Sequence, residues 1–171
     1  AEWQETTVIY GLLDASTDTQ YIRINKAYLG EGDAMMMAQY SDSINFNPNN
    51  IEVELHKLGL NDTLMSITLD TTLLEKEDGF FAIDNNIIYR AVLPSNFLRN
   101  DKIYAITIKN IISGNEVSSS TEVISNFSFS TPLSSTSKFG FYNPSQPDSS
   151  KFRSKTIDWL KVENGEIYQL D

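Results

Sequence analysis

The chain has 171 residues, of which 40% are hydrophobic and 21% are charged. A chain of this length buries about 70% of its unfolded surface, so we expect a hydrophobic core. The balance of 13 Lys and Arg against 23 Asp and Glu gives a net charge of -10, which argues against nucleic acid or a bare membrane as a partner. The sequence has no cysteine, which excludes disulfides, thiolate nucleophiles and Cys-based zinc sites.

Alternation of apolar and polar residues predicts a first strand over 7–13 and a second over 21–28. Between them, Asp14–Thr19 consists of residues whose side chains bond to nearby backbone, which indicates a turn. Further strands are predicted at residues 51–58, 64–69, 87–93, 102–108 and 117–124. About seven short strands separated by turn signals are typical of an antiparallel β-sandwich of the immunoglobulin or fibronectin type III kind.

A long insertion, Gly30–Asn50, separates the second and third predicted strands. Within it, Asp33 is expected to cap a short helix over Ala34–Gln39. Three consecutive methionines on that helix point about 100° apart, so they cannot all face the core. Either the helix closes one open end of the sandwich, or an exposed methionine such as Met36 contacts a partner.

Composition changes after Ile124, where Ser, Thr, Pro and Asn dominate. We therefore divide the chain into a sandwich over residues 5–125, a Ser/Pro-rich linker over 126–155 and the start of a second β module over 156–171. In the last segment, Asn164-Gly165 predicts a hairpin in which both turn residues need positive φ. Because a lone hairpin is marginal in water, this segment either docks on the sandwich or opens a further module, and we favour the second.

One stretch, from Leu98 to Ile108, resembles the corner of fibronectin type III and related sandwiches that leads into the sixth strand. The resemblance implies that the Tyr104 hydroxyl bonds to backbone upstream while Leu98 fills the bottom of the core. Residues Ile157–Trp159, with Tyr168 further on, similarly resemble the tryptophan strand and its successor in the same superfamily.

A longer resemblance, to uncharacterised exported lipoproteins of Bacteroidetes, covers most of residues 6 to 125. It rests on the run Ile9–Asp14, continued by Asp18–Lys26 and Tyr28–Gly32. It implies an exported protein at the outer membrane or cell surface of a Gram-negative bacterium, held by a lipid anchor outside this chain. The first residues lack an initiator Met and a secretion signal, so we expect a processed chain. The family brings no established activity.

The sequence contains few residues in patterns typical of a catalytic site or a metal site. His56 is the only histidine, and its strand pattern predicts a solvated position on the polar face. Asp14, Ser16 and Asp18 have the spacing with which calcium loops begin, but the later ligands are missing and turn chemistry explains the same residues. No catalytic motif is found, so we expect neither an enzyme nor a cofactor.

Binding is the favoured class of function. Phe46, in a loop rich in Asn, and Phe80, near a predicted turn, could stack on sugar faces, although a single ring under a loop more often belongs to the core. With Met36 they are the candidate ligand-binding residues. Three hypotheses follow: a non-catalytic binding or spacer module with a protein or glycan partner, a carbohydrate-binding module in polysaccharide capture, and an accessory domain of an enzyme whose catalytic part lies downstream.

Overall fold

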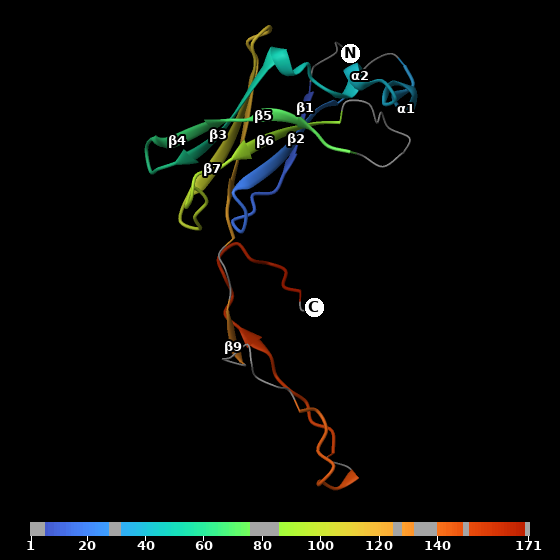
Figure 1. Cartoon of the computed structure of the whole chain (residues 1–171), viewed down its shortest axis with the longest axis vertical. Coiled ribbons are helices and arrows are strands. Elements are labelled where there is room, and N and C mark those ends of the chain that lie inside the picture. The colour runs from blue at the N-terminus through green and yellow to red at the C-terminus, as the bar shows by residue number, and fades with distance from the viewer. Residues whose placement is uncertain are drawn as a thin grey trace. The chain divides into compact units, whose positions relative to one another are not determined.

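The protein is all-β, with antiparallel sheets and a few very short helices (Figure 1). The computed structural model describes residues 6–27, 32–75, 86–124, 128–131, 140–148 and 151–169. The chain divides into two compact units, Ala1–Val123 and Ile124–Asp171, which are described separately below.

The first unit is a sandwich of two four-stranded antiparallel sheets. One sheet has the order β1-β2-β6-β5, formed by Thr6–Gly11, Thr19–Ala27, Ile87–Val92 and Asp70–Leu73. The other has the order β4-β3-β7-β8, formed by Thr63–Thr68, Ile51–Leu58, Ile103–Asn110 and Glu116–Glu122. The first order is the A-B-E-D sheet of immunoglobulin constant domains, and the second is their C-F-G sheet with one more strand beside β3. The predicted sandwich is therefore confirmed.

The core lies between these sheets and follows from the period of two along each strand. Val53 and Leu55 on β3 and Ile106 and Ile108 on β7 are all buried, whereas the residues between them face outward. Each such side chain contributes roughly 1.5–3 kcal/mol of hydrophobic stabilisation. Strand β8 differs, because all seven of its residues are exposed along one edge of its sheet.

All seven predicted strands exist with small shifts at their ends, but β5 is missing from the sequence prediction. The predicted strand ends at Leu69, which is buried and whose amide bonds to the Val53 carbonyl at 2.9 Å, and the structure continues directly into β5. Before this residue the chain pairs with β3, and after it with β6. The chain therefore changes sheets within one continuous stretch.

The corner before β7 has the arrangement that the resemblance implied. The buried Tyr104 hydroxyl donates to the Phe97 carbonyl at 2.8 Å and accepts from the Arg99 amide at 2.7 Å. The core position expected for Leu98 is filled by Phe97, which is 3% exposed and stacks on Tyr104 with ring centroids 5.7 Å apart. Leu98 itself is half-buried beside this cluster, so that assignment was wrong by one residue.

The insertion contains α1 (Ala34–Met37), α2 (Ser41–Ile44) and a 3-10 turn, η1 (Pro48–Asn50). Asp33 caps α1 as predicted, because its Oδ1 accepts from the Met35 amide at 2.8 Å. The helix ends at Met37 rather than Gln39 and buries none of its residues, so it does not plug the sandwich. None of the helices within the described ranges exceeds four residues, far below the length that crosses a bilayer.

The second unit contains a two-stranded antiparallel sheet of β9 (Phe129–Thr131) and β10 (Asp158–Trp159). Strand β9 lies inside the segment expected to be a linker. Asn164 makes the predicted turn with φ of 61°, but Gly165 stays outside the left-handed region and no strand follows through Gln169.

The predicted C-terminal hairpin is therefore wrong, and side-chain contacts take the place of a strand ladder. The Tyr168 ring packs 5.5 Å from that of Trp159, and its hydroxyl accepts from the Val162 amide at 2.9 Å. A Cβ at Gly165 would lie 2.8 Å from both the Tyr168 hydroxyl and a Val162 methyl group, so a larger residue there would displace these side chains.

Candidate functional site

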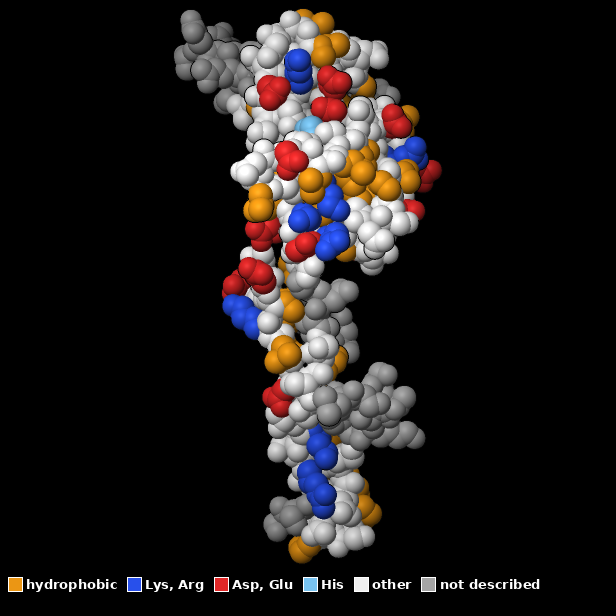
Figure 2. All heavy atoms as spheres, turned by 90° about the vertical axis from the view of Figure 1, so that its left-hand side faces the viewer, with side chains coloured by type: hydrophobic (Ala, Val, Ile, Leu, Met, Phe, Trp, Pro, Cys, Tyr) orange, Lys and Arg blue, Asp and Glu red, His pale blue; other side chains and the backbone are white. Residues whose placement is uncertain are grey.

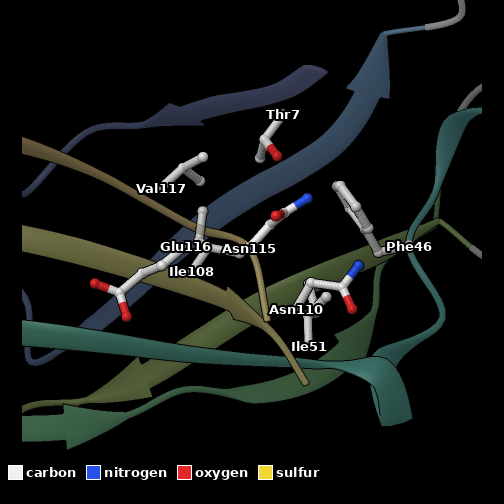
Figure 3. Close-up of a pocket in the computed structure, with 8 residues that line it drawn as sticks. All are labelled: Thr7, Phe46, Ile51, Ile108, Asn110, Asn115, Glu116 and Val117. Atoms are coloured by element: carbon white, nitrogen blue, oxygen red, sulfur yellow. The ribbon is translucent and has the colours of Figure 1, made fainter. Parts of the chain in front are cut away.

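A cavity of about 270 Å³ opens at one corner of the sandwich, between the edge strands of the two sheets (Figure 3). Its walls come from β1, β3, β7, β8, the turn that joins β7 to β8, and the segment after α2. The lining residues are Thr7, Phe46, Ile51, Ile108, Asn110, Asn115, Glu116 and Val117. In immunoglobulin-type sandwiches this end carries the loops between the second and third strands and between the sixth and seventh.

The floor of the cavity is apolar and fixed. Ile51 and Ile108 are core residues, and Phe46 is only 6% exposed. The Lys26 ammonium lies 5.7 Å from the Phe46 ring centroid and donates to the Asp42 carbonyl at 2.7 Å. Phe46 therefore lines the cavity as part of its floor, and it is not the exposed stacking ring that the sequence suggested.

The rim of the cavity is polar and is built on the turn between β7 and β8. The Asn110 Oδ1 accepts from the amides of Ile112 and Ser113 at 3.0 and 3.1 Å, and Gly114 takes φ of 76° to close the turn. This holds Asn115 immediately before β8, where its side-chain amide extends toward Phe46 and Thr7 in Figure 3. Within the described residues neither the Asn115 side-chain amide nor the Thr7 hydroxyl has a hydrogen-bond partner, so both are available to a ligand.

Glu116 is the charged residue of the lining set, and its carboxylate is directed away from the cavity floor (Figure 3). Glu116 lies opposite Lys109 in the β7–β8 register, which places it on the outer face of the sheet. Figure 3 accordingly shows its carboxylate pointing away from Phe46. A neutral amide, a hydroxyl and an apolar floor suit a small uncharged polar ligand with one apolar face.

His56 lies on the outer polar face, as predicted, but its side chain is 17% exposed rather than solvated, because both ring nitrogens have side-chain partners. Nδ1 lies 2.7 Å from the Ser66 hydroxyl, and Nε2 lies 3.2 Å from the Thr107 hydroxyl and 4.0 Å from the Glu54 carboxylate. Figure 2 shows this histidine among interspersed acidic and basic side chains, with hydrophobic side chains gathered beside it.

The serine, histidine and glutamate have the chemical types of a catalytic triad, but their placement is that of a cross-strand pair. Ser66 lies directly opposite His56 in the β3–β4 register. Because β3 is an inner strand, its amides are engaged by β4 and β7 rather than left to stabilise an oxyanion. We interpret the His56 network as a structural link across three strands.

Asp14 and Asp18, the two possible calcium ligands, serve their own turn. The Asp14 Oδ1 accepts from the Ser16 amide at 2.8 Å and the Ser16 hydroxyl at 2.7 Å, which lowers the pKa of that carboxyl. The Asp18 Oδ1 accepts from the Thr19 hydroxyl at 3.1 Å. In the described part of the chain, no three acidic or histidine side chains lie close enough to hold a metal ion.

Of the three candidate binding residues, the two that the structure describes do not line the same cavity. Phe46 lines the cavity, Met36 is 54% exposed on α1 and does not line it, and Phe80 lies outside the described residues. Sequence reasoning missed Thr7 and Asn115. The turn of Asn, Ser and Gly at 110–115 was the available signal, because such a turn at a strand end presents side chains at the end of a sandwich.

Comparison with known proteins gives no further assignment. The chain matches no protein-family model, and it has no significant match among curated proteins or solved structures.

Proposed function

We propose that this chain is a non-catalytic binding module of an exported, cell-surface lipoprotein, and that its ligand occupies the cavity beside Phe46. The observation that supports this most directly is the pairing of a rigid apolar floor with an uncommitted amide and hydroxyl. Binding residues on turns held by a β-sandwich are common, because the strands fix the geometry while the turns vary.

Preorganisation supports the same assignment. The turn that presents Asn115 is closed by backbone bonds from Gly114 to Asn110 and from Asn110 to Asn115, both at 2.8 Å. A ligand would therefore meet groups that are already in place, and little free energy would be lost in ordering them.

A carbohydrate is the ligand class that the cavity fits best, and polysaccharide capture is accordingly the second candidate function. Sugars combine hydroxyls, which would bond to Asn115 and Thr7, with an apolar ring face, which would lie on Phe46 and Ile108. The volume of about 270 Å³ lies just below the usual range for drug-sized ligands. We therefore expect one terminal sugar residue rather than a long segment of chain to enter.

The test is a glycan array followed by titration of any hit into isotope-labelled protein. We expect saturable binding that perturbs the Asn115 side-chain amide signals, and at least a tenfold loss of affinity in Asn115→Ala and Thr7→Val. Thr6→Val is the matched control, because Thr6 is the neighbouring residue of β1 on the opposite, outer face.

Two results would contradict this assignment. Equal affinity in Thr6→Val and Thr7→Val would place the ligand elsewhere on the protein. If no glycan on the array binds, carbohydrate is excluded as the ligand class, and a spacer or protein-binding role is left.

A further inference from the structure

The outer face of the β1-β2-β6-β5 sheet has an unusual set of exposed side chains. Tyr10 is 70% exposed, Tyr21 46%, Val8 47% and Val92 61%. Arg90 is also exposed, and Arg23 is half-buried. We refer to these six residues together as the Tyr/Arg face: Val8, Tyr10, Tyr21, Arg23, Arg90 and Val92.

Strand register arranges the tyrosines and arginines alternately. Tyr10 on β1 lies opposite Arg23 on β2, and Tyr21 on β2 lies opposite Arg90 on β6. Directly opposed residues on one face have Cβ atoms about 4.5–5.5 Å apart, so each tyrosine has an arginine as its cross-strand neighbour. Rings and charges are thus brought together by three adjacent strands rather than by a loop.

The other sheet has an outer face of different composition, which serves as an internal reference. Its exposed residues include the charged or small polar side chains of Glu52, Lys109, Glu116, Ser118 and Ser120, together with the apolar side chain of Ile103, which is 44% exposed. Interface centres are enriched in Tyr and Arg and depleted in Lys, Glu and Ser. The two outer faces of this sandwich therefore differ in residue composition, and the Tyr/Arg face has the composition of an interface.

The charge of the Tyr/Arg face is opposite to that of the chain. The chain has a net charge of -10, yet this face presents two guanidinium groups. Among the described residues neither arginine has an acidic side chain within ion-pair distance. Arg23 donates to the Asn25 amide oxygen at 2.8 Å, and Asp70 is the acid opposite Arg90 in register.

From these observations we propose that the Tyr/Arg face is the docking surface for an acidic protein segment that also contains aromatic or apolar side chains. Carboxylates of the partner would bond to Arg23 and Arg90 through the guanidinium fork, and its apolar groups would pack on Tyr10, Tyr21 and Val92. This surface is separate from the cavity at Phe46, so the proposal does not depend on that site.

The experiment measures binding of a fluorescently labelled random copolymer of glutamate and tyrosine to the full chain by anisotropy. We expect saturable binding that is at least tenfold weaker in the double variant Tyr21→Ser/Arg90→Ser. The matched control is Thr107→Ser/Lys109→Ser, which removes the same charge from the outer face of the other sheet. Circular dichroism melts of both variants establish that any loss does not come from unfolding.

Competing occupants give different results, and each would overturn the proposal. Equal affinity in the two double variants would show that the copolymer does not use this face. Equal or tighter binding of polygalacturonate, an anionic sugar polymer, would assign the face to acidic glycans. A concentration-dependent dimer in sedimentation, abolished by Tyr21→Ser/Arg90→Ser, would identify a second copy of the chain as the occupant.

Discussion

Two tyrosines in the sandwich are almost equally buried but differ in what their hydroxyls contact. Tyr104 and Tyr89 are 1% and 3% exposed. The Tyr104 hydroxyl bonds to two backbone groups of the corner, whereas the Tyr89 hydroxyl is buried without a partner in the described part of the chain. The same chemical change at the two positions should therefore have opposite consequences.

We predict that Tyr104→Phe lowers the free energy of unfolding by about 1–3 kcal/mol, because it leaves the Arg99 amide and the Phe97 carbonyl unsatisfied. Tyr89→Phe should be neutral or stabilising by up to about 1 kcal/mol, because it removes a hydroxyl that was desolvated without compensation. Urea denaturation of both variants measures the difference. If Tyr89→Phe is the more destabilising of the two, the assignment of these hydroxyls is wrong.

At the scale of elements, the turn between β1 and β2 depends on one side chain. Gln20 is 1% exposed. Its side-chain oxygen, Oε1, accepts from the Asp14 backbone amide at 2.8 Å. Its side-chain nitrogen, Nε2, donates to the backbone carbonyls of Asp14 and Thr17 at 2.9 and 2.8 Å. The turn was predicted from Asp14–Thr19, but Gln20 was not, because in sequence it is one more polar residue at the start of a strand. Only the fold shows that it faces inward.

We predict that Gln20→Leu destabilises the protein by about 2–3 kcal/mol, because three backbone groups lose their partner at once. Hydrogen exchange of the Asp14 amide should also become faster, since the turn opens locally. Gln39→Leu is the control, because Gln39 is exposed. Equal stability of the two variants would show that the Gln20 bonds contribute nothing to the turn.

The strands could be predicted because their inward and outward residues alternate, and β3 at Ile51–Leu58 was located without error. The end of β4 was predicted to within one residue, but β5 was missed, because its four residues Asp70–Leu73 are too few to establish a period and carry no sign of which sheet they join. In the second unit, a strand of three residues such as β9 is too short to establish a period. Its pairing with β10 is decided by contacts distant in sequence.

At the scale of the whole molecule, the candidate cavity is a product of the fold. It brings together Thr7, Phe46 and Asn115, which are far apart along the chain. Sequence alone named Phe46 as an aromatic residue near turns, but it could not indicate that β1 and β8 are neighbouring edges. A site formed where two sheets meet becomes predictable only once the strand order is known.

Stability of the whole molecule should also depend on alkaline pH through Tyr89. Burial raises the pKa of Tyr89 to about 12, whereas an unfolded tyrosine titrates near pH 10. Below pH 10 the Tyr89 hydroxyl is protonated in both the folded and the unfolded chain, and its contribution to stability is complete. Between pH 10 and about 12 the unfolded chain releases this proton while the folded chain retains it, so the free energy of unfolding falls. The difference of two pKa units between the unfolded and folded states corresponds to a total loss of about 2.7 kcal/mol in the free energy of unfolding.

We predict that urea midpoints fall between pH 9 and pH 11.5 and that Tyr89→Phe shows a smaller fall. Burial also raises the pKa of Tyr104, so part of the decline should persist in the variant. Titration of tyrosinate absorbance gives an independent measurement. An identical decline in both proteins would contradict the assignment to Tyr89.

As an exposed edge strand, β8 could pair with the same strand of another copy when molecules are crowded together. A second copy that extended the sheet by antiparallel pairing centred on Ser119 would bring Glu116 of each chain against Glu122 of the other. Like charges at both ends of that ladder, with three serines at its centre and one valine on each chain, oppose this pairing. Repulsion between these glutamates therefore disfavours edge-to-edge aggregation through β8, even where many copies of the protein are close together.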